Sequence, residues 1–211
     1  MADAQAVLLD VYETALTCDF SAHERELPTL AGVPTDVWER ETELRFRAVM
    51  DGRLSLTEAF EEVITAAGRP VSADLLAELL RRDQQLLIDN AFVYEDTITF
   101  LKSARACGLR TAFVSNCAEN TRPLLEHLGL AGLVDAVVLS CEVGVSKPAP
   151  AIFLRATELL GVAPGAAVFV DDQERFCAGA RSLGMTAMRI VRRGEHAPGS
   201  IRDLTELIPA G

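Results

Sequence analysis

The stretch "AVLLDVYETAL", residues 6–16, decides how the chain is interpreted. Its first four residues are all apolar, as in a strand that is covered on both faces, and the run stops at Asp10. A carboxylate directly after a buried strand is either a turn residue or a group placed for chemistry. Tyr12 follows two residues later, and what both residues mean depends on the rest of the chain.

Four more apolar runs of this kind follow in the second half of the chain. Together with the first run they are expected strands, at residues 6–10, 110–115, 136–140, 166–171 and 186–191. Helical patterns separate the later runs, and each ends in Gly, a frequent helix stop. These helices are expected at 96–108, 119–129, 149–161 and 174–184. The alternation predicts an α/β fold with a doubly wound, Rossmann-like parallel sheet.

The segment between the first two strands has no strand pattern. It contains at least three helical patterns, at about 35–50, 55–67 and 72–89, with Thr35, Ser55 and Ser72 at the expected N-cap positions. Ser55 is followed by Glu58, which completes a capping box. We therefore expect two parts, an α/β core formed by residues 1–16 and 92–211 and a helical cap formed by residues 17–91.

Composition narrows the possible partners. The net charge of −11 argues against nucleic-acid binding, which needs a basic surface, but a local positive pocket could still hold a small anion. The five cysteines form no C-x-x-C pair, and we expect neither a signal peptide nor a membrane-spanning segment. We expect a cytoplasmic protein with reduced thiols and no membrane partner; its oligomeric state is left open.

Polar residues stand where several of the expected strands end, and parallel strands bring those ends to one edge of the sheet. They are Asp10, Ser115, Asn116, Asp171 and Asp172, with Lys147 in the loop after the third strand. An aspartate can act as a nucleophile, and clustered carboxylates suit Mg²⁺. A lysine and a serine can hold an anionic group. These residue types outline a phosphoryl-transfer site.

The motifs resemble those of the haloacid dehalogenase-like (HAD) superfamily, in the subclass whose helical cap follows the first motif. The matching stretches are "LLDVYETAL", "FVSN", "SCEVGVSKPAPAIF" and "VFVDDQ", in the family order. The resemblance implies Asp10 as the nucleophile and a Mg²⁺ ion held by Asp10, Asp171, Asp172 and the backbone carbonyl of Tyr12. It also implies that Thr14, Ser115 and Asn116 bind substrate and that Lys147 is the catalytic lysine.

One position departs from the family's phosphatases, in which the residue two places after the nucleophile is an aspartate that works as acid and base. Here it is Tyr12, a poor base at neutral pH. The family's dehalogenases resemble this chain at Tyr12, because a halide leaves without a proton. They lack the acidic pair that Asp171 and Asp172 form here, and they use a cap arginine, for which Arg40 is the best candidate.

Three functions therefore stay open. The first is a Mg²⁺-dependent phosphatase that acts on a small phosphorylated metabolite through an aspartyl-phosphate intermediate. The second is a 2-haloacid dehalogenase-like hydrolase, with Tyr12 among its catalytic residues. The third is a catalytically impaired homologue that binds a small anionic ligand. The acidic pair favours the phosphatase, and a small phosphate ester or haloacid is the expected partner.

Overall fold

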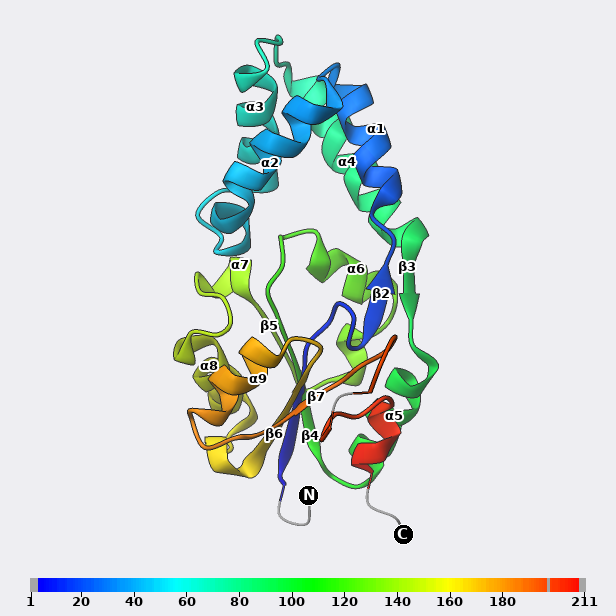
Figure 1. The fold of residues 1–211 in the computed structure, drawn as a ribbon, viewed down its shortest axis with the longest axis vertical. Helices are drawn as coiled ribbons and strands as arrows, with labels where there is room; N and C mark the ends of the chain where they lie inside the picture. The colour runs from blue at the N-terminus through cyan, green and yellow to red at the C-terminus, as the bar shows by residue number, and fades with distance from the viewer. Residues whose placement is uncertain (1–3, 197, 209–211) are drawn as a thin grey trace.

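The computed structural model describes residues 4–196 and 198–208. A five-stranded, fully parallel sheet lies at its centre in the order β5-β4-β1-β6-β7 (Figure 1). Its strands are β1 (Ala6–Leu9), β4 (Arg110–Ser115), β5 (Ala136–Leu139), β6 (Ala167–Asp171) and β7 (Thr186–Arg189). The predicted α/β fold and all five predicted strands are confirmed, and β1 is the central strand.

Helices cover both faces of the sheet, and alternate residues of each strand serve different faces. Val7 and Leu9 of β1 pack in one apolar cluster, whereas Ala6 and Leu8 pack in the other. The first cluster includes residues of α5 (Glu95–Ala106), α6 (Thr121–His127) and η3 (Leu204–Leu207). The second includes residues of α8 (Pro150–Leu160) and α9 (Glu174–Arg181). Shorter helices are η1 (Ala131–Leu133), α7 (Ser140–Val143) and η2 (Pro164–Ala166).

Four helices, which we call the helical insert, stand above this core (Figure 1). They are α1 (Ser21–Ala31), α2 (Thr35–Met50), α3 (Leu56–Ala66) and α4 (Ala73–Asn90). The short strands β2 (Leu16–Cys18) and β3 (Ala91–Val93) pair antiparallel and connect the insert to the core. Neither strand was predicted, nor was α1. In the described part of the chain, every helix is too short or too polar to cross a membrane.

Helix capping in the insert follows the sequence in two cases out of three. The side chains of Ser55 and Ser72 cap α3 and α4, and Ser55 forms the predicted capping box with Glu58. Thr35 was expected as an N-cap but is the first residue of α2, and Pro34 takes the cap position. Pro34 has no backbone N–H, and none is needed where the helix begins.

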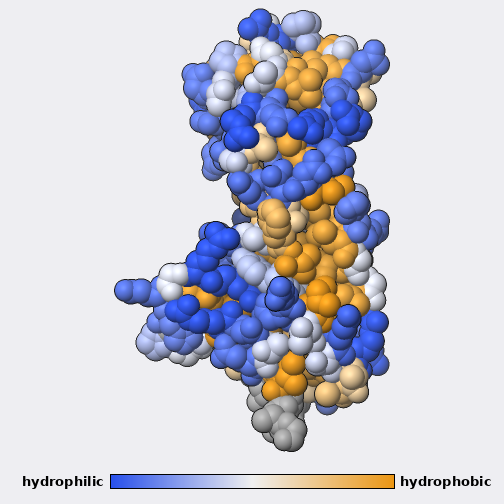
Figure 2. Space-filling view, turned by 90° about the vertical axis from the view of Figure 1, so that its right-hand side faces the viewer, coloured by the Kyte–Doolittle hydropathy of each residue, from blue (hydrophilic) through white to orange (hydrophobic). Residues whose placement is uncertain are grey.

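The helical insert also contacts the core away from β2 and β3. Ser140 donates a hydrogen bond of 2.6 Å to the carbonyl of Met50, and Ser146 donates one of 2.5 Å to Asp51. On α4, the carboxylate of Asp83 accepts from Asn120 of the core at 2.8 Å. The molecule narrows between insert and core, where Figure 2 shows apolar residues gathered on the face turned to the viewer. The insert is thus held over the strand ends.

Candidate active site at the carboxyl ends of the strands

The core of the site is a buried ion cluster. The Nζ atom of Lys147 lies 2.7 Å from Oδ1 of Asp10 and 2.6 Å from Oδ2 of Asp171. Burial alone lowers the pKa of Lys147, but the two carboxylates outweigh burial and raise that pKa above its ordinary value. Lys147 is therefore a permanent cation, fixed between the end of β1 and the end of β6.

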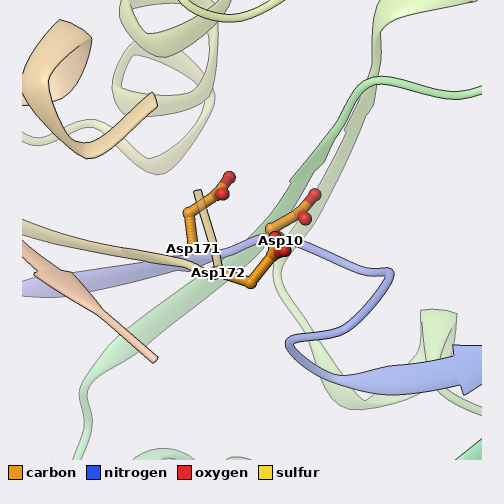
Figure 3. A group of neighbouring side chains, drawn as sticks. All are labelled: Asp10, Asp171 and Asp172. Carbon is orange, nitrogen blue, oxygen red and sulfur yellow. The ribbon is translucent and has the colours of Figure 1, made fainter. Parts of the chain in front are cut away.

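A third carboxylate, that of Asp172, completes an acidic group. Oxygen atoms of Asp10, Asp171 and Asp172 all lie within 4.8 Å of one another, and Figure 3 shows the three side chains gathered where β1 and β6 end. Burial raises the pKa of Asp10 from 3.8 to about 6, although Lys147 pulls it down. Burial and the charge of Asp10 likewise raise the pKa of Asp172. When all three carboxyl groups are ionised, the single positive charge of Lys147 thus does not balance them.

The excess of negative charge in this cluster indicates whether a metal ion would fit there. Three carboxylates and one ammonium leave two negative charges, which a divalent cation would balance. Carboxylate oxygens are the ligands that Mg²⁺ prefers. Asp171 already uses Oδ2 for Lys147 and Oδ1 for the backbone N–H of Gln173, whereas Lys147 bonds only Oδ1 of Asp10, and Asp172 is the least buried of the three. The acidic group could therefore bind a metal, with Asp10 and Asp172 as its foremost ligands.

A cavity of about 120 Å³ opens beside this cluster. The described residues on its wall are Asp10, Tyr12, Glu13, Ser115, Asn116, Lys147, Asp172, Gln173 and Phe176. The hydroxyl of Ser115 is buried and has no hydrogen-bond partner among the described residues. Since a buried hydroxyl without a partner is costly, this group is prepared for a ligand oxygen. The cavity can hold a small anionic group between Ser115 and Lys147.

Asn116 holds the lysine loop in place. Its side chain donates to the carbonyl of Lys147 at 3.0 Å and accepts from the N–H of Lys147 at 2.7 Å. The ring of Phe176 also lies 5.1 Å from the ammonium, a favourable cation–π distance. The apolar ring of Phe176 thus packs against a charge that it helps to bury.

The phenol of Tyr12 is buried and bonded to a neighbouring side chain. Its hydroxyl lies 3.0 Å from Oγ1 of Thr121, and its ring packs 6.1 Å from that of Phe20. Burial raises the pKa of the Tyr12 phenol far above its ordinary value, so the group stays neutral. Glu13 turns toward β2 instead: its φ is +55°, and its carboxylate accepts from Thr17 at 2.5 Å and from Tyr94 at 3.4 Å.

Two of the predicted substrate-binding residues lie elsewhere. Thr14 is fully buried and is not among the residues on the cavity wall; its carbonyl accepts from Arg192. The side chain of Arg40 is 60% exposed and bonds to Glu41 on its own helix. The geometry therefore supports neither residue as a substrate contact. Glu13, Gln173 and Phe176 line the cavity without having been predicted, although each directly neighbours or closely follows a predicted residue.

Comparison with known proteins agrees with this arrangement. The sequence model of the haloacid dehalogenase-like hydrolase family matches residues 4–184, which is most of the chain. The chain belongs to the haloacid dehalogenase-like hydrolases. The match covers both the helical insert and the strand ends of this HAD-like chain, so the resemblance drawn from its motifs is confirmed.

Relatives of the HAD-like chain include two kinds of hydrolase. Phosphatase MT3486 of Mycobacterium tuberculosis is 31% identical over 215 residues, which cover 96% of this chain and 94% of that protein. The crystal structure of a HAD phosphatase from Thermococcus onnurineus is also 31% identical, with a TM-score of 0.68 over 96% of this chain and 95% of that one. An (S)-2-haloacid dehalogenase of Xanthobacter autotrophicus is 27% identical over 202 residues, which cover 92% of this chain and 75% of that protein.

Proposed function

We propose that the chain is a Mg²⁺-dependent phosphatase that cleaves a small phosphate monoester through a phosphorylated Asp10. One observation carries this proposal: Asp10, Lys147, Asp172 and Ser115 line one small cavity, and the hydroxyl of Ser115 has no partner among the described residues. A carboxylate nucleophile, a fixed cation and a free hydrogen-bond donor are the parts that phosphoryl transfer requires.

The first half of the reaction forms a bond between Asp10 and phosphorus. Oδ1 of Asp10 accepts from Lys147, so Oδ2 is the attacking atom. As it bonds to phosphorus, the bond from phosphorus to the alcohol oxygen breaks, and that oxygen takes the electron pair. Ser115 donates to a phosphoryl oxygen, and Lys147 balances the negative charge of the transferred group. A bound Mg²⁺ would supply further positive charge to the phosphoryl oxygens.

The second half removes the phosphoryl group from Asp10. Water attacks phosphorus, the bond from phosphorus to Oδ2 breaks, and the Asp10 carboxylate is restored together with inorganic phosphate. Burial raises the pKa of Tyr12 far above its ordinary value, and its hydroxyl is bonded to Thr121, so it serves neither as the acid of the first half nor as the base of the second. Solvent must then protonate the departing alcohol, which makes esters of acidic alcohols the better substrates.

Phosphate release from p-nitrophenyl phosphate tests this function, because its leaving group needs no proton. We expect turnover with MgCl₂, none with EDTA, and none in the Asp10→Asn variant at any Mg²⁺ concentration. Glu39→Gln, which changes an exposed carboxylate on α2, is the control and should behave as wild type. Turnover in Asp10→Asn would contradict the proposal.

A second candidate is dehalogenation of a small 2-haloacid, which the neutral, bonded Tyr12 favours. Here Oδ2 of Asp10 would attack the carbon that carries the halogen, and the halide would leave with its electron pair. Halide release in the presence of EDTA is the distinguishing measurement, since this reaction needs no metal. A ligand-binding homologue would release neither phosphate nor halide, yet an anion would stabilise it against heat.

A further inference from the structure

A second cavity adjoins the catalytic one. It has a volume of about 290 Å³ and lies between the helical insert and the core. The two cavities share Tyr12 and Asn116 on their walls. The described residues around the second cavity are Tyr12, Phe20, Phe46, Met50, Leu87, Asn116, Cys117, Ala118, Asn120 and Thr121. None of these carries a charge, although the catalytic cavity beside it contains several charged groups.

The polar side chains on this wall are already bonded within the protein. Asn120 donates to Asp83 at 2.8 Å, and the hydroxyls of Tyr12 and Thr121 lie 3.0 Å apart. Asn116 bonds the backbone of Lys147 on both sides. A ligand that enters this space therefore meets mainly apolar surface. Hydroxyl groups of a sugar would be taken out of water there with few partners in return.

Two aromatic rings on this wall, those of Phe20 and Phe46, are unusually open to solvent. Phe20 is 44% exposed and Phe46 is 55% exposed, whereas large apolar side chains are normally buried. A ligand that covers them gains free energy from the apolar area removed from water. The two rings reach the cavity from the helical insert, so they would close over a ligand whose anionic group is held below.

We propose that this apolar cavity holds the leaving part of the substrate, so that the substrate joins one anionic head to a compact, unbranched or aromatic apolar body. The position of the head rests on the proposed function. The preference for an apolar body rests only on the wall of the second cavity. Substrates with a second anionic group or several hydroxyls, such as sugar phosphates, are disfavoured.

Binding of n-alkylphosphonates tests the preference for an apolar body separately from catalysis, because their carbon–phosphorus bond is not cleaved. We would measure Kd by calorimetry with MgCl₂ for methyl-, propyl- and hexylphosphonate. Each added methylene should lower Kd by about fourfold until the cavity is full, as expected for burial of a CH₂ group. 2,3-Dihydroxypropylphosphonate should bind more weakly than propylphosphonate. A matching series of alkanoates shows whether a phosphate-like or a carboxylate head is preferred.

Phe46→Ser is the test variant, since this exposed residue can change without loss of the fold. In it, the ratio of Kd values for methyl- and hexylphosphonate should fall about tenfold toward one. The matched control is Leu44→Ser: Leu44 is on the same helix, is 71% exposed and is not among the residues on the cavity wall. The control should keep the wild-type ratio.

Either of two results overturns the inference: Kd values independent of chain length, or tighter binding of the dihydroxy compound. The neutral 1-hexanol tests the cavity without any head group, by saturation-transfer NMR. Contact with wild type and Leu44→Ser but not with Phe46→Ser supports the apolar cavity even if every phosphonate and alkanoate fails to bind. In that case the proposed function is wrong, while the preference for an apolar body stands; no contact at all overturns that preference.

Discussion

The ammonium of Lys147 lies 2.7 Å from Oδ1 of Asp10, and the two side chains are only 1% and 9% exposed. The residues are 137 positions apart in the chain, so the pair exists only when β1 and the loop after β5 are both in place. It neutralises one oxygen of Asp10 and leaves the other free for attack. The fold and the proposed nucleophile thus depend on the same contact.

Replacing Lys147 by Met should therefore damage both stability and activity. Removing one partner of a buried pair costs about 3 kcal/mol or more, because the remaining charge has no compensation. We expect Lys147→Met to lose about this much unfolding free energy in urea and at least ~10²-fold of its turnover of p-nitrophenyl phosphate. The double variant Asp10→Asn/Lys147→Met should recover part of the stability and none of the activity. Equal stability of the single and double variants would argue against the pair.

Substitution of Tyr12 by Asp should supply the acid–base group that the family's phosphatases have at this position. Tyr12→Asp places a carboxyl group near the leaving oxygen, and general acid–base help is worth about 10²–10⁴ in rate. We expect a gain for ethyl phosphate, whose alkoxide needs a proton, and little gain for p-nitrophenyl phosphate. Tyr12→Phe is the control: it removes only the hydroxyl bonded to Thr121, about 1 kcal/mol of stability, and leaves both rates within about twofold. A large loss in Tyr12→Phe would mean that the phenol takes part in the reaction.

Much of the sheet could be predicted because strands that are covered on both faces have nearly continuous apolar sequences. The parallel order of the strands explains why Asp10, Lys147 and Asp172 meet, because the carboxyl ends of parallel strands lie at one edge of the sheet. The helix α1 was missed because it contains Pro28, a residue that ordinarily interrupts a helix. Strands β2 and β3 have three residues each, too few for an alternating pattern.

Tertiary packing decides the features that no local pattern encodes. Arg40 was a candidate because of its residue type, but the orientation of α2 directs its side chain to solvent and to Glu41. The bond from Asn120 to Asp83 joins residues of core and insert, and neither belongs to a motif. Phe46 and Met50 lie four residues apart on one face of α2, a spacing that could have indicated a shared apolar wall.

Stability without metal should fall as the pH rises. Burial raises the pKa of Asp10 from 3.8 to about 6, so between these values the folded state holds a proton that the unfolded chain has lost. The unfolding free energy then decreases with rising pH through that window, by about 3 kcal/mol for Asp10. We expect urea unfolding in EDTA to show greater stability at pH 4.5 than at pH 7, and Mg²⁺ to restore stability at pH 7.

Asp172→Asn isolates the cause of this pH dependence. It removes a carboxyl group whose own pKa is raised by burial and by the charge of Asp10, so the loss of stability between pH 4.5 and pH 7 should become smaller and Mg²⁺ should stabilise less. Glu39→Gln, on the exposed side of α2, should leave both effects unchanged. A pH dependence identical in all three proteins would place its origin outside the acidic group.

The contact between insert and core can be tested at Gly52. A Cβ atom there would lie 1.9 Å from the carbonyl oxygen of Cys141, and φ is +65°. Gly68 has nearly the same φ, +68°, with no atom within 4 Å of a Cβ. Gly68→Ala should therefore cost only the backbone strain, about 1 kcal/mol. Gly52→Ala should cost clearly more and raise KM for p-nitrophenyl phosphate, because the insert must shift away from the core.

The most direct test of the central claim is to trap the covalent intermediate. The enzyme is mixed with MgCl₂ and excess p-nitrophenyl phosphate, quenched in acid within one turnover, digested, and analysed by mass spectrometry. The account predicts one phosphoryl group on Asp10, absent in Asp10→Asn and in EDTA. A phosphoryl group on any other residue, or none while p-nitrophenol is released in a burst, would contradict it.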